Sequence, residues 1–333
     1  MKKSIVILLA VLMVLSSIVS VVCAEDDAPL FIAINKSADQ NYFIDLQGAF
    51  TDKAEELGAE AKTFDAKLDP SLGVSLVDNA ISAGAAGIAI TVPDQTIGPA
   101  ISMAAREAGV VLIATDDSIV DENGDPVPFV GFDGTEMGRQ AGEAAATLLE
   151  EYGWLKDPDI KVGALIANAE TVSVIVQRCE AEVAELVKAG MSEDMIFTVP
   201  YTGETISAQD AAGPIITANP DITHWVVTGG NDEGVLGVLN ALATAGFDSD
   251  HILGIGVGGN ESCKPWAAGI ESGFKASVWV SGISVGTKAA EVLYDAVVNG
   301  IEPPQFSIAD TFLLTPENYQ EVMDPVSLQN CGL

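Results

Sequence analysis

The sequence predicts an α/β protein made of two doubly wound lobes, each built on a parallel sheet. Short apolar runs recur along the chain without the polar alternation of a half-exposed strand, as is typical of parallel strands covered on both faces. Segments with apolar residues at helical spacing separate these runs. The alternation restarts near residue 128, and 333 residues are enough to bury two cores.

The first half of the chain alternates strands with helices. An apolar run at 30–34 predicts the first strand. Apolar residues then recur at helical spacing from Phe43 to Leu57, and Gly58 ends that helix. The same reasoning predicts strands at 61–64, 87–91 and 110–115, and helices at 72–83 and 97–108.

The second half repeats the pattern. A strand at 128–132 leads into a long helix at 135–152. Because every later strand is again followed by a helical segment, a second parallel sheet is expected. Its predicted strands are 161–166, 196–199, 225–228 and 252–257, and its predicted helices are near 172–189, 205–218 and 232–245.

The N-terminus has the features of an export signal. Lys2 and Lys3 begin it, an apolar run follows, and small Ala24 precedes acidic residues. We expect a signal peptide at 1–24 and a periplasmic or extracellular protein with no membrane insertion after processing. The alternatives are a permanent membrane anchor, since the run is nearly long enough to span, and a lipid attached to Cys23.

The charge balance excludes two classes of partner. The chain holds 48 acidic and 15 basic residues, for a formal charge of −33. A surface this acidic repels the phosphates of nucleic acids and the headgroups of anionic lipids. Nucleic-acid binding and peripheral membrane binding are therefore not expected.

The cysteines and histidines indicate neither a disulfide framework nor a metal site. Cys179, Cys263 and Cys331 remain after the signal segment. Cys263 could pair with Cys331 outside the cell, but we expect three ordinary thiols. Two histidines and no Cys-x-x-Cys give no support for zinc. No cofactor is predicted.

Polar residues follow nearly every predicted strand. In open parallel sheets, ligands bind beyond the carboxyl ends of the strands, so these residues are the candidates for a site. Carboxylates accept, lysine and arginine donate, and asparagine does both, which suits the hydroxyl groups of a sugar. The strand-exit residues are Asn35-Lys36, Pro93-Asp94, Asp116-Asp117, Phe132-Asp133, Asn168, Asn231-Asp232 and Glu261.

Each candidate also has an ordinary structural interpretation. Asp116-Asp117 could cap a helix, and Lys36 could be a surface lysine. By its pattern alone, Arg178 would be a solvated helical arginine. The acidic run from Asp121 to Asp125 begins like a calcium loop but lacks the distal glutamate, so a hairpin turn is expected there.

One glycine motif suggests a different function. Gly254, Gly256 and Gly259 fit the dinucleotide fingerprint Gly-x-Gly-x-x-Gly. The motif lies late in the chain, and Glu261 would face the pyrophosphate, so we expect these glycines to let the backbone approach a ligand cleft. A secreted NAD-dependent enzyme remains the alternative from another functional class.

Several of these motifs together resemble a known family. Ile34-Asn35-Lys36 with Tyr42-Phe43, then 113–117, and later Gly230-Asn231-Asp232 are similar to periplasmic binding proteins of the ribose/arabinose type. The resemblance covers nearly all of 29–321. It implies the type I fold, with two lobes joined by a three-strand hinge.

The resemblance also implies a function. A monosaccharide, either an L-arabinose-like pentose or a related hexose, would be held in the interlobe cleft. A monomer would present it to the membrane subunits of an ABC importer, without catalysis. The alternative within binding is a sensor that docks to a chemoreceptor or kinase. The implied lobes are 29–132 plus 282–308, and 134–280 plus 309–331.

The implied ligand-binding residues come from both lobes. Four positions depart from the family pattern: Gln40 stands for a glutamate, Gly258 for an asparagine, Glu261 for an aspartate and Thr91 for a cysteine. These departures leave the specific sugar open. The expected ligand-binding residues are Lys36, Gln40, Tyr42, Phe43, Thr91, Asp116, Asp117, Phe132, Arg178, Asn231, Asp232 and Glu261.

Overall fold

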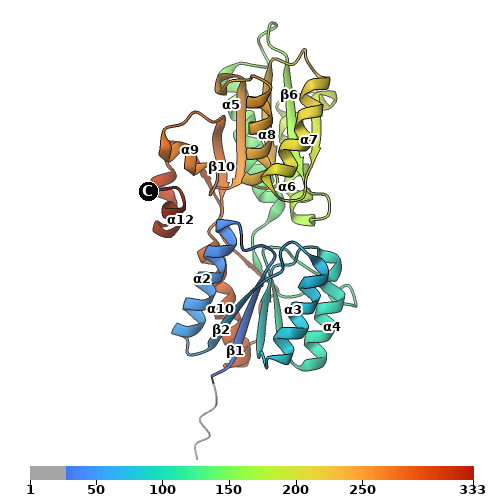
Figure 1. Cartoon of the computed structure of the whole chain (residues 1–333), viewed down its shortest axis with the longest axis vertical. Helices are drawn as coiled ribbons and strands as arrows, with labels where there is room; N and C mark the ends of the chain where they lie inside the picture. The colour runs from blue at the N-terminus through green and yellow to red at the C-terminus, as the bar shows by residue number, and fades with distance from the viewer. Residues whose placement is uncertain (1–27) are drawn as a thin grey trace, which may run out of the picture.

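The computed structural model describes residues 28–333 as two α/β lobes stacked along the long axis of the molecule (Figure 1). The predicted signal peptide at 1–24 lies outside the described residues. Each lobe contains one six-stranded sheet. The fold class predicted from the sequence is therefore confirmed.

The N-terminal lobe is built on a parallel sheet with strand order β11-β5-β4-β3-β1-β2. Side chains along β1 alternate between the two faces: Phe31 and Ala33 join one core cluster, and Ile32 and Ile34 join another. In Figure 1, α2 and α10 cover one face of the sheet, and α3 and α4 cover the other. The elements are β1 (Leu30–Asn35), α2 (Asn41–Glu56), β2 (Glu60–Asp65), α3 (Pro70–Ser82), β3 (Gly87–Ile90), a 3₁₀ turn (Gln95–Ile97), α4 (Gly98–Ala108), β4 (Val111–Thr115), β5 (Phe129–Gly131), α10 (Gly282–Val297) and β11 (Phe306–Ile308).

The C-terminal lobe has strand order β12-β10-β9-β8-β6-β7. Only β12 runs antiparallel to its neighbour. The elements are α5 (Gly134–Tyr152), β6 (Val162–Asn168), α6 (Ser173–Lys188), a 3₁₀ turn (Glu193–Met195), β7 (Ile196–Pro200), α7 (Thr205–Ala218), β8 (His224–Gly229), α8 (Asp232–Thr244), a 3₁₀ turn (Ser249–His251), β9 (Ile252–Gly258), α9 (Cys263–Ala268), β10 (Phe274–Trp279), β12 (Phe312–Leu314), α11 (Tyr319–Val322) and α12 (Pro325–Asn330).

The chain crosses between the lobes three times, at 131–134, 279–282 and 308–312. Each crossing follows a strand at or near one end of a sheet, so the linking segments meet along one side of the molecule. The carboxyl ends of the parallel strands in both lobes face the space between the lobes (Figure 1). This topology brings the strand-exit residues of both lobes together.

Short local signals fix the ends of several elements. The Asp69 carboxylate caps α3 by accepting from two backbone N–H groups, and Asp133 caps α5 by accepting from the N–H of Glu136. Gly109 ends α4 in the left-handed conformation that glycine adopts without strain. The hairpin expected from Asp121 is confirmed, since Val120 pairs antiparallel with Pro126.

The expectation of three ordinary thiols was wrong. Cys263 and Cys331 form a disulfide, with their Cα atoms 5.3 Å apart, whereas Cys179 is free and buried. The bond joins α9 to α12 because the C-terminal segment folds back onto a small apolar cluster that includes Trp279 and Tyr319. Such a return across 68 positions leaves no local pattern in the sequence.

Candidate functional site

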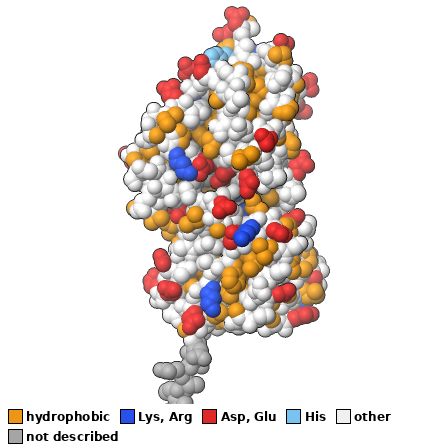
Figure 2. All heavy atoms as spheres, viewed as in Figure 1, with side chains coloured by type: hydrophobic (Ala, Val, Ile, Leu, Met, Phe, Trp, Pro, Cys, Tyr) orange, Lys and Arg blue, Asp and Glu red, His pale blue; other side chains and the backbone are white. Residues whose placement is uncertain are grey.

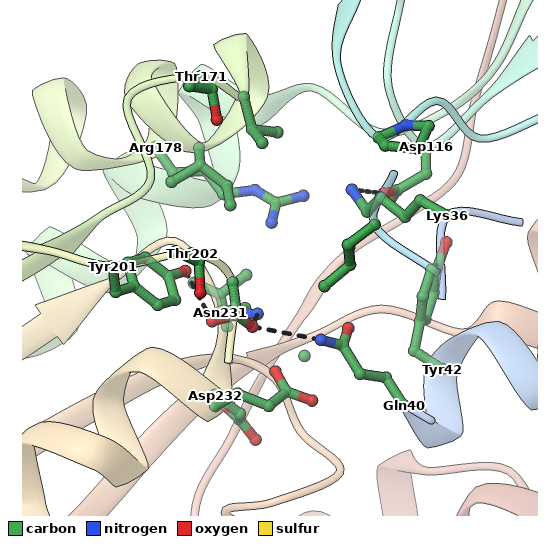
Figure 3. A pocket seen from close by; sticks show the side chains of 18 of the residues that line it. Lys36, Gln40, Tyr42, Asp116, Thr171, Arg178, Tyr201, Thr202, Asn231 and Asp232 are labelled. Atoms are coloured by element: carbon green, nitrogen blue, oxygen red, sulfur yellow. Dashed lines mark hydrogen bonds and ion pairs between the residues drawn. The ribbon is translucent and has the colours of Figure 1, made fainter. Parts of the chain in front are cut away.

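A cavity of about 510 Å³ lies between the lobes. Its walls come from the strand exits of both sheets and from the first turns of the helices that follow. Lys36 and Arg178 reach into it from opposite lobes (Figure 3). Its volume is in the range of small-molecule sites in proteins.

Lys36 holds the centre of the N-lobe wall. Lys36 directly follows β1, and Asp116 and Asp117 directly follow β4. The Lys36 Nζ donates to Asp117 Oδ2 at 2.5 Å and to Asp116 Oδ2 at 3.1 Å. The same ammonium lies 5.3 Å from the centre of the Phe43 ring. No helix begins at this acidic pair, so the helix-cap interpretation was wrong. The buried lysine is paired, as a buried charge must be.

Burial and pairing set the protonation of this cluster. Burial lowers the pKa of Lys36, but the carboxylates of Asp117 and Asp116 outweigh it, and the net effect is a raised pKa. Burial raises the pKa of Asp117 to about 6 in spite of the lysine. Lys36 is therefore charged at neutral pH and can donate a third hydrogen bond into the cavity.

Arg178 is the cation of the C-lobe wall. It lies on α6, is 7% exposed, and donates from Nη1 to the carbonyl of Gly230 at 2.7 Å. α6 packs closely on α5 because Gly138 has no side chain, and an added Cβ there would lie 2.1 Å from the Arg178 carbonyl oxygen. The solvated-arginine interpretation was therefore wrong. The Nε of Arg178 has no protein partner within residues 28–333.

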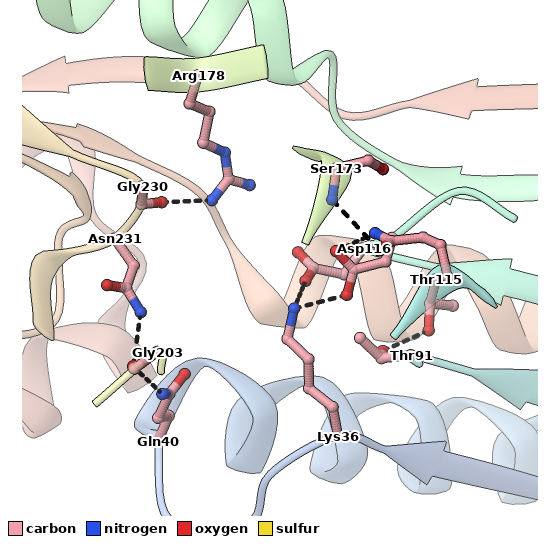
Figure 4. Close-up of polar contacts among 12 residues, drawn as sticks. Lys36, Gln40, Thr91, Thr115, Asp116, Ser173, Arg178, Gly203, Gly230 and Asn231 are labelled. Atoms are coloured by element: carbon pink, nitrogen blue, oxygen red, sulfur yellow. Dashed lines mark hydrogen bonds and ion pairs between the residues drawn. The ribbon is translucent and has the colours of Figure 1, made fainter. Parts of the chain in front are cut away.

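Asn231 stands where β8 passes into α8. Its Oδ1 accepts from the Tyr201 hydroxyl at 2.7 Å and from the Gly234 N–H at 2.9 Å. Its Nδ2 donates to the Gly203 carbonyl, which also accepts from Gln40 of the other lobe at 3.3 Å (Figure 4). Asn231 is thus fixed by three protein contacts, and the carbonyl that accepts from its Nδ2 also links the lobes.

Asp232 lies at the cavity, but its carboxylate is already engaged. Oδ1 accepts from Ser277, and Oδ2 accepts from the backbone N–H groups of Glu261 and Ser262. Gly256 makes room for it, since an added Cβ would lie within 1.9 Å of Asp232 Oδ1. The middle glycine of the dinucleotide-like motif therefore accommodates an aspartate where the fingerprint would leave space for a pyrophosphate.

The predicted site residues fall into two groups. Thr91 bonds Thr115 at 2.7 Å in the buried layer behind the cavity, and Asp117 lies behind Lys36. The Glu261 carboxylate pairs with Lys264 at 2.5 Å and does not line the cavity. The predicted residues that do line it are Lys36, Gln40, Tyr42, Phe43, Asp116, Phe132, Arg178, Asn231 and Asp232.

Sequence reasoning left out several lining residues. Asn168 ends β6 and was visible as a strand exit, and Glu233 directly follows the predicted Asn231-Asp232 pair. Tyr201 lies one residue beyond the end of β7, where the same signal would have found it, whereas at β9 the search passed over Asn260 and chose Glu261, the next residue. Thr171 and Thr202 are in loops and carry no such signal.

Four polar atoms at this cavity are buried without a protein partner in residues 28–333. They are the Tyr42 hydroxyl, Asn168 Oδ1, Arg178 Nε and Asn260 Oδ1. Buried polar groups are nearly always hydrogen-bonded, and leaving one unpaired costs about 1–3 kcal/mol. Their concentration at one cavity indicates a site built for a polar ligand.

Comparisons with known proteins agree with this architecture. The chain is 32% identical over 286 residues to the L-arabinose-binding periplasmic protein of Escherichia coli strain K12, covering 84% of this chain and 85% of that one. It is 29% identical to the ABC transporter L-arabinose-binding periplasmic protein of Azospirillum brasilense, covering 90% of each.

Solved structures share the fold. A Caulobacter myo-inositol binding protein matches with a TM-score of 0.73 and 21% identity, covering 88% of this chain and 95% of that chain. A carbohydrate transporter solute binding protein of Agrobacterium radiobacter matches with a TM-score of 0.72 and 20% identity, covering 88% and 96%. A family profile described as a periplasmic binding protein domain matches residues 31–301. The chain therefore belongs to the periplasmic binding protein family, a family of binding proteins and not of enzymes.

Proposed function

We propose that this protein captures a monosaccharide between its lobes in the periplasm and, as a monomer, delivers it to the membrane subunits of an ABC importer. Two relatives that align over most of their length are named for binding L-arabinose, and one of them is named as part of an ABC transporter. Within residues 28–333, no helix is both long and apolar enough to cross a membrane.

The observation that carries the proposal is the set of hydrogen-bonding groups that converge on the cavity. Lys36 and Asp116 come from one lobe, Arg178 from the other, and the unpartnered polar atoms lie among them. A sugar hydroxyl donates and accepts at once, so it can satisfy groups of both kinds. Tyr42 and Phe132 pack edge to face at 5.9 Å and offer apolar surface to the carbon face of the ring.

Six of the candidate residues then have specific roles. Lys36 donates to a ring substituent, and Asp116 accepts from a hydroxyl, while Asp117 and Thr91 hold the layer behind them. From the other lobe, Arg178 donates and the amide of Asn231 uses its remaining N–H. Charged partners make these hydrogen bonds roughly twice as strong as neutral ones.

Closure of the lobes supplies the rest of the site. Two hydrogen bonds cross the cleft at its rim, from Gln40 to the Gly203 carbonyl and from the Ser173 N–H to Gln95. We propose that 29–132 plus 282–308 and 134–280 plus 309–331 move as rigid lobes about the three crossing segments. A closed cleft excludes water and so strengthens every hydrogen bond to the ligand.

The proposed ligand is an L-arabinose-like pentose or a related hexose. To test this, thermal unfolding of residues 25–333 is measured with L-arabinose, D-galactose, D-allose, myo-inositol and NAD. A ligand present at 100 times its Kd should stabilise the fold by about 2.7 kcal/mol. We expect a shift with one or a few sugars, lost in Asp117→Ala because Lys36 then loses its closest partner. No shift with any sugar, or a shift with NAD alone, would refute the proposal.

A further inference from the structure

The first turn of α8 places three polar residues side by side at the cavity. Asn231 and Asp232 use their side-chain oxygens on the protein itself: both Asp232 oxygens and the Asn231 Oδ1 accept protein hydrogen bonds. These two residues shape the wall, and neither has an oxygen free of protein contacts. Glu233, the third, is different.

Glu233 lines the cavity and is partly buried. Within residues 28–333 its carboxylate makes no hydrogen bond or ion pair with another side chain, in contrast to its neighbour Asp232. The charged groups that face it are Asp232 on its own helix, Glu261 just before α9 and Lys264 in the first turn of α9. Lys264 is already paired with Glu261 at 2.5 Å, so no uncommitted cation neutralises Glu233.

We propose that Glu233 is a specificity-determining residue whose carboxylate accepts a hydrogen bond from a ligand hydroxyl at the C-lobe end of the cavity. The inference rests on the proposed sugar-binding function. A carboxylate accepts a stronger hydrogen bond than a neutral group. A ligand without a donor at that position would leave Glu233 buried and unpaired, and such mismatches discriminate strongly between similar substrates.

The protonation of Glu233 provides an independent readout. Burial, reinforced by Asp232, raises the pKa of Glu233 to about 8. A hydroxyl that donates to the carboxylate favours its charged form and lowers that pKa. Ligand binding near pH 7.5 should therefore release protons from Glu233, and affinity should rise as the pH increases towards 8.

The test is calorimetry near pH 7.5 in two buffers of different ionisation enthalpy, with whichever of L-arabinose, D-galactose, D-allose and myo-inositol gives the largest thermal shift. The variants are Glu233→Gln, which keeps the shape, and Glu233→Ala. Glu151→Gln is the matched control, because Glu151 is an exposed glutamate in the last turn of α5 and does not line the cavity. Circular dichroism checks that each variant folds.

In Glu233→Ala we expect affinity to fall about ten- to hundredfold, the usual effect of losing a charged hydrogen bond. Proton release should fall sharply in both variants, and Glu151→Gln should match the unaltered protein. If both Glu233 variants bind with unaltered affinity and unaltered proton release, the role of Glu233 is refuted while sugar binding stands. If the unaltered protein binds none of the sugars, both proposals fail together.

Discussion

At the scale of single residues, the site combines an unusual backbone conformation with charged side chains that are shielded from water. Asp116 has a φ of 61°, in the left-handed region that few residues other than glycine occupy, although aspartate tolerates it better than most. That turn brings its carboxylate to Lys36. Lys36, Asp117 and Arg178 are charged groups withdrawn from water. Such groups are stabilised only by specific partners. A ligand in the cavity can supply further hydrogen bonds to them.

Glu182 is a buried carboxyl that lies one turn from Arg178 on α6. It is fully buried, accepts from the Thr228 hydroxyl at 2.8 Å, and has one oxygen without a protein partner in residues 28–333. Burial raises the pKa of Glu182 from 4.5 to about 7, although Thr228 and Arg178 oppose the shift. Between about pH 4.5 and pH 7, Glu182 is therefore protonated in the folded chain and ionised in the unfolded chain.

We predict that Glu182→Gln stabilises the protein at high pH and not at low pH. Because the folded pKa is raised, the contribution of this group to stability falls as the pH rises from about 4.5 to 7. The pKa shift corresponds to roughly 3 kcal/mol at most. Urea unfolding at pH 4.5 and pH 8 should show a gain only at pH 8.

The control for this prediction is Glu180→Gln, on the exposed face of the same helix. It should change the free energy of unfolding little at either pH, since surface substitutions are usually within about 0.5 kcal/mol. An equal response of the two variants to pH would mean that Glu182 is charged in the folded protein.

The sequence located some site residues and not others for a physical reason. Strand ends are predictable from apolar runs, and Lys36 and Asn231 stand directly at them. That the Glu233 carboxylate makes no hydrogen bond with another side chain has a different origin. Ser277 and the backbone N–H groups of 261–262 donate to Asp232 and not to Glu233. That information lies in tertiary contacts, so no local pattern could separate Glu233 from Asp232.

At the scale of elements, closely packed helix pairs position the site. α10 lies against α2 in the N-lobe, and an added Cβ at Gly286 would lie 2.1 Å from the Leu46 carbonyl oxygen. α5 and α6 meet in the same way at Gly138 in the C-lobe. The glycines let the helix backbones approach, and so set the depth at which α2 and α6 present their side chains to the cavity.

We predict that Gly286→Ala destabilises the protein, whereas Gly48→Ala stabilises it. At Gly286 the new methyl group meets backbone, which cannot move aside as a flexible side chain could, and overpacking of this kind costs about 1–3 kcal/mol. Gly48 lies in α2 with nothing within 4 Å of an added Cβ, so the helix gains about 0.5–1 kcal/mol. Chemical denaturation of the two variants measures both effects, and a Gly286→Ala protein that is as stable as the unaltered one would show that the helix contact adjusts freely.

The helices and strands up to β9 were predicted, whereas those after it were not, including the six-residue β10 and the 16-residue α10. The helix expected at 205–218 has those bounds in the structure, because it is long enough to show its pattern. β11 and β12 have three residues each, too few for any period to appear, and α11 and α12 are held by the disulfide and the cluster around Trp279. Their positions follow from contacts between distant segments, which the strand and helix patterns do not record.

At the scale of the whole molecule, two facts dominate. Within residues 28–333 three short crossings join the lobes, and contacts such as Asn330 with Asp45, at 2.8 Å, add to them, which fits the proposed movement of the lobes about the crossings. The formal charge is −33, and in Figure 2 acidic side chains are spread over both lobes with few basic ones among them. Like charges at this density repel one another and oppose the compact state.

Salt should therefore stabilise this protein. Many of its carboxylates lack a basic partner, since 48 acidic residues share 15 basic ones. The Debye length falls from about 10 Å at 0.1 M to about 3 Å at 1 M ionic strength, which screens repulsion across the surface but hardly affects buried pairs such as Lys36 with Asp117. Between 0.05 and 1 M NaCl we expect a gain of at least about 1 kcal/mol, or roughly 2–4 °C in Tm. The gain should shrink near pH 4, where protonation removes much of the repulsion, and this pH dependence separates screening from general salt effects. A Tm that is constant or falls with NaCl at pH 7 would mean that the surface carboxylates are already compensated in the folded state.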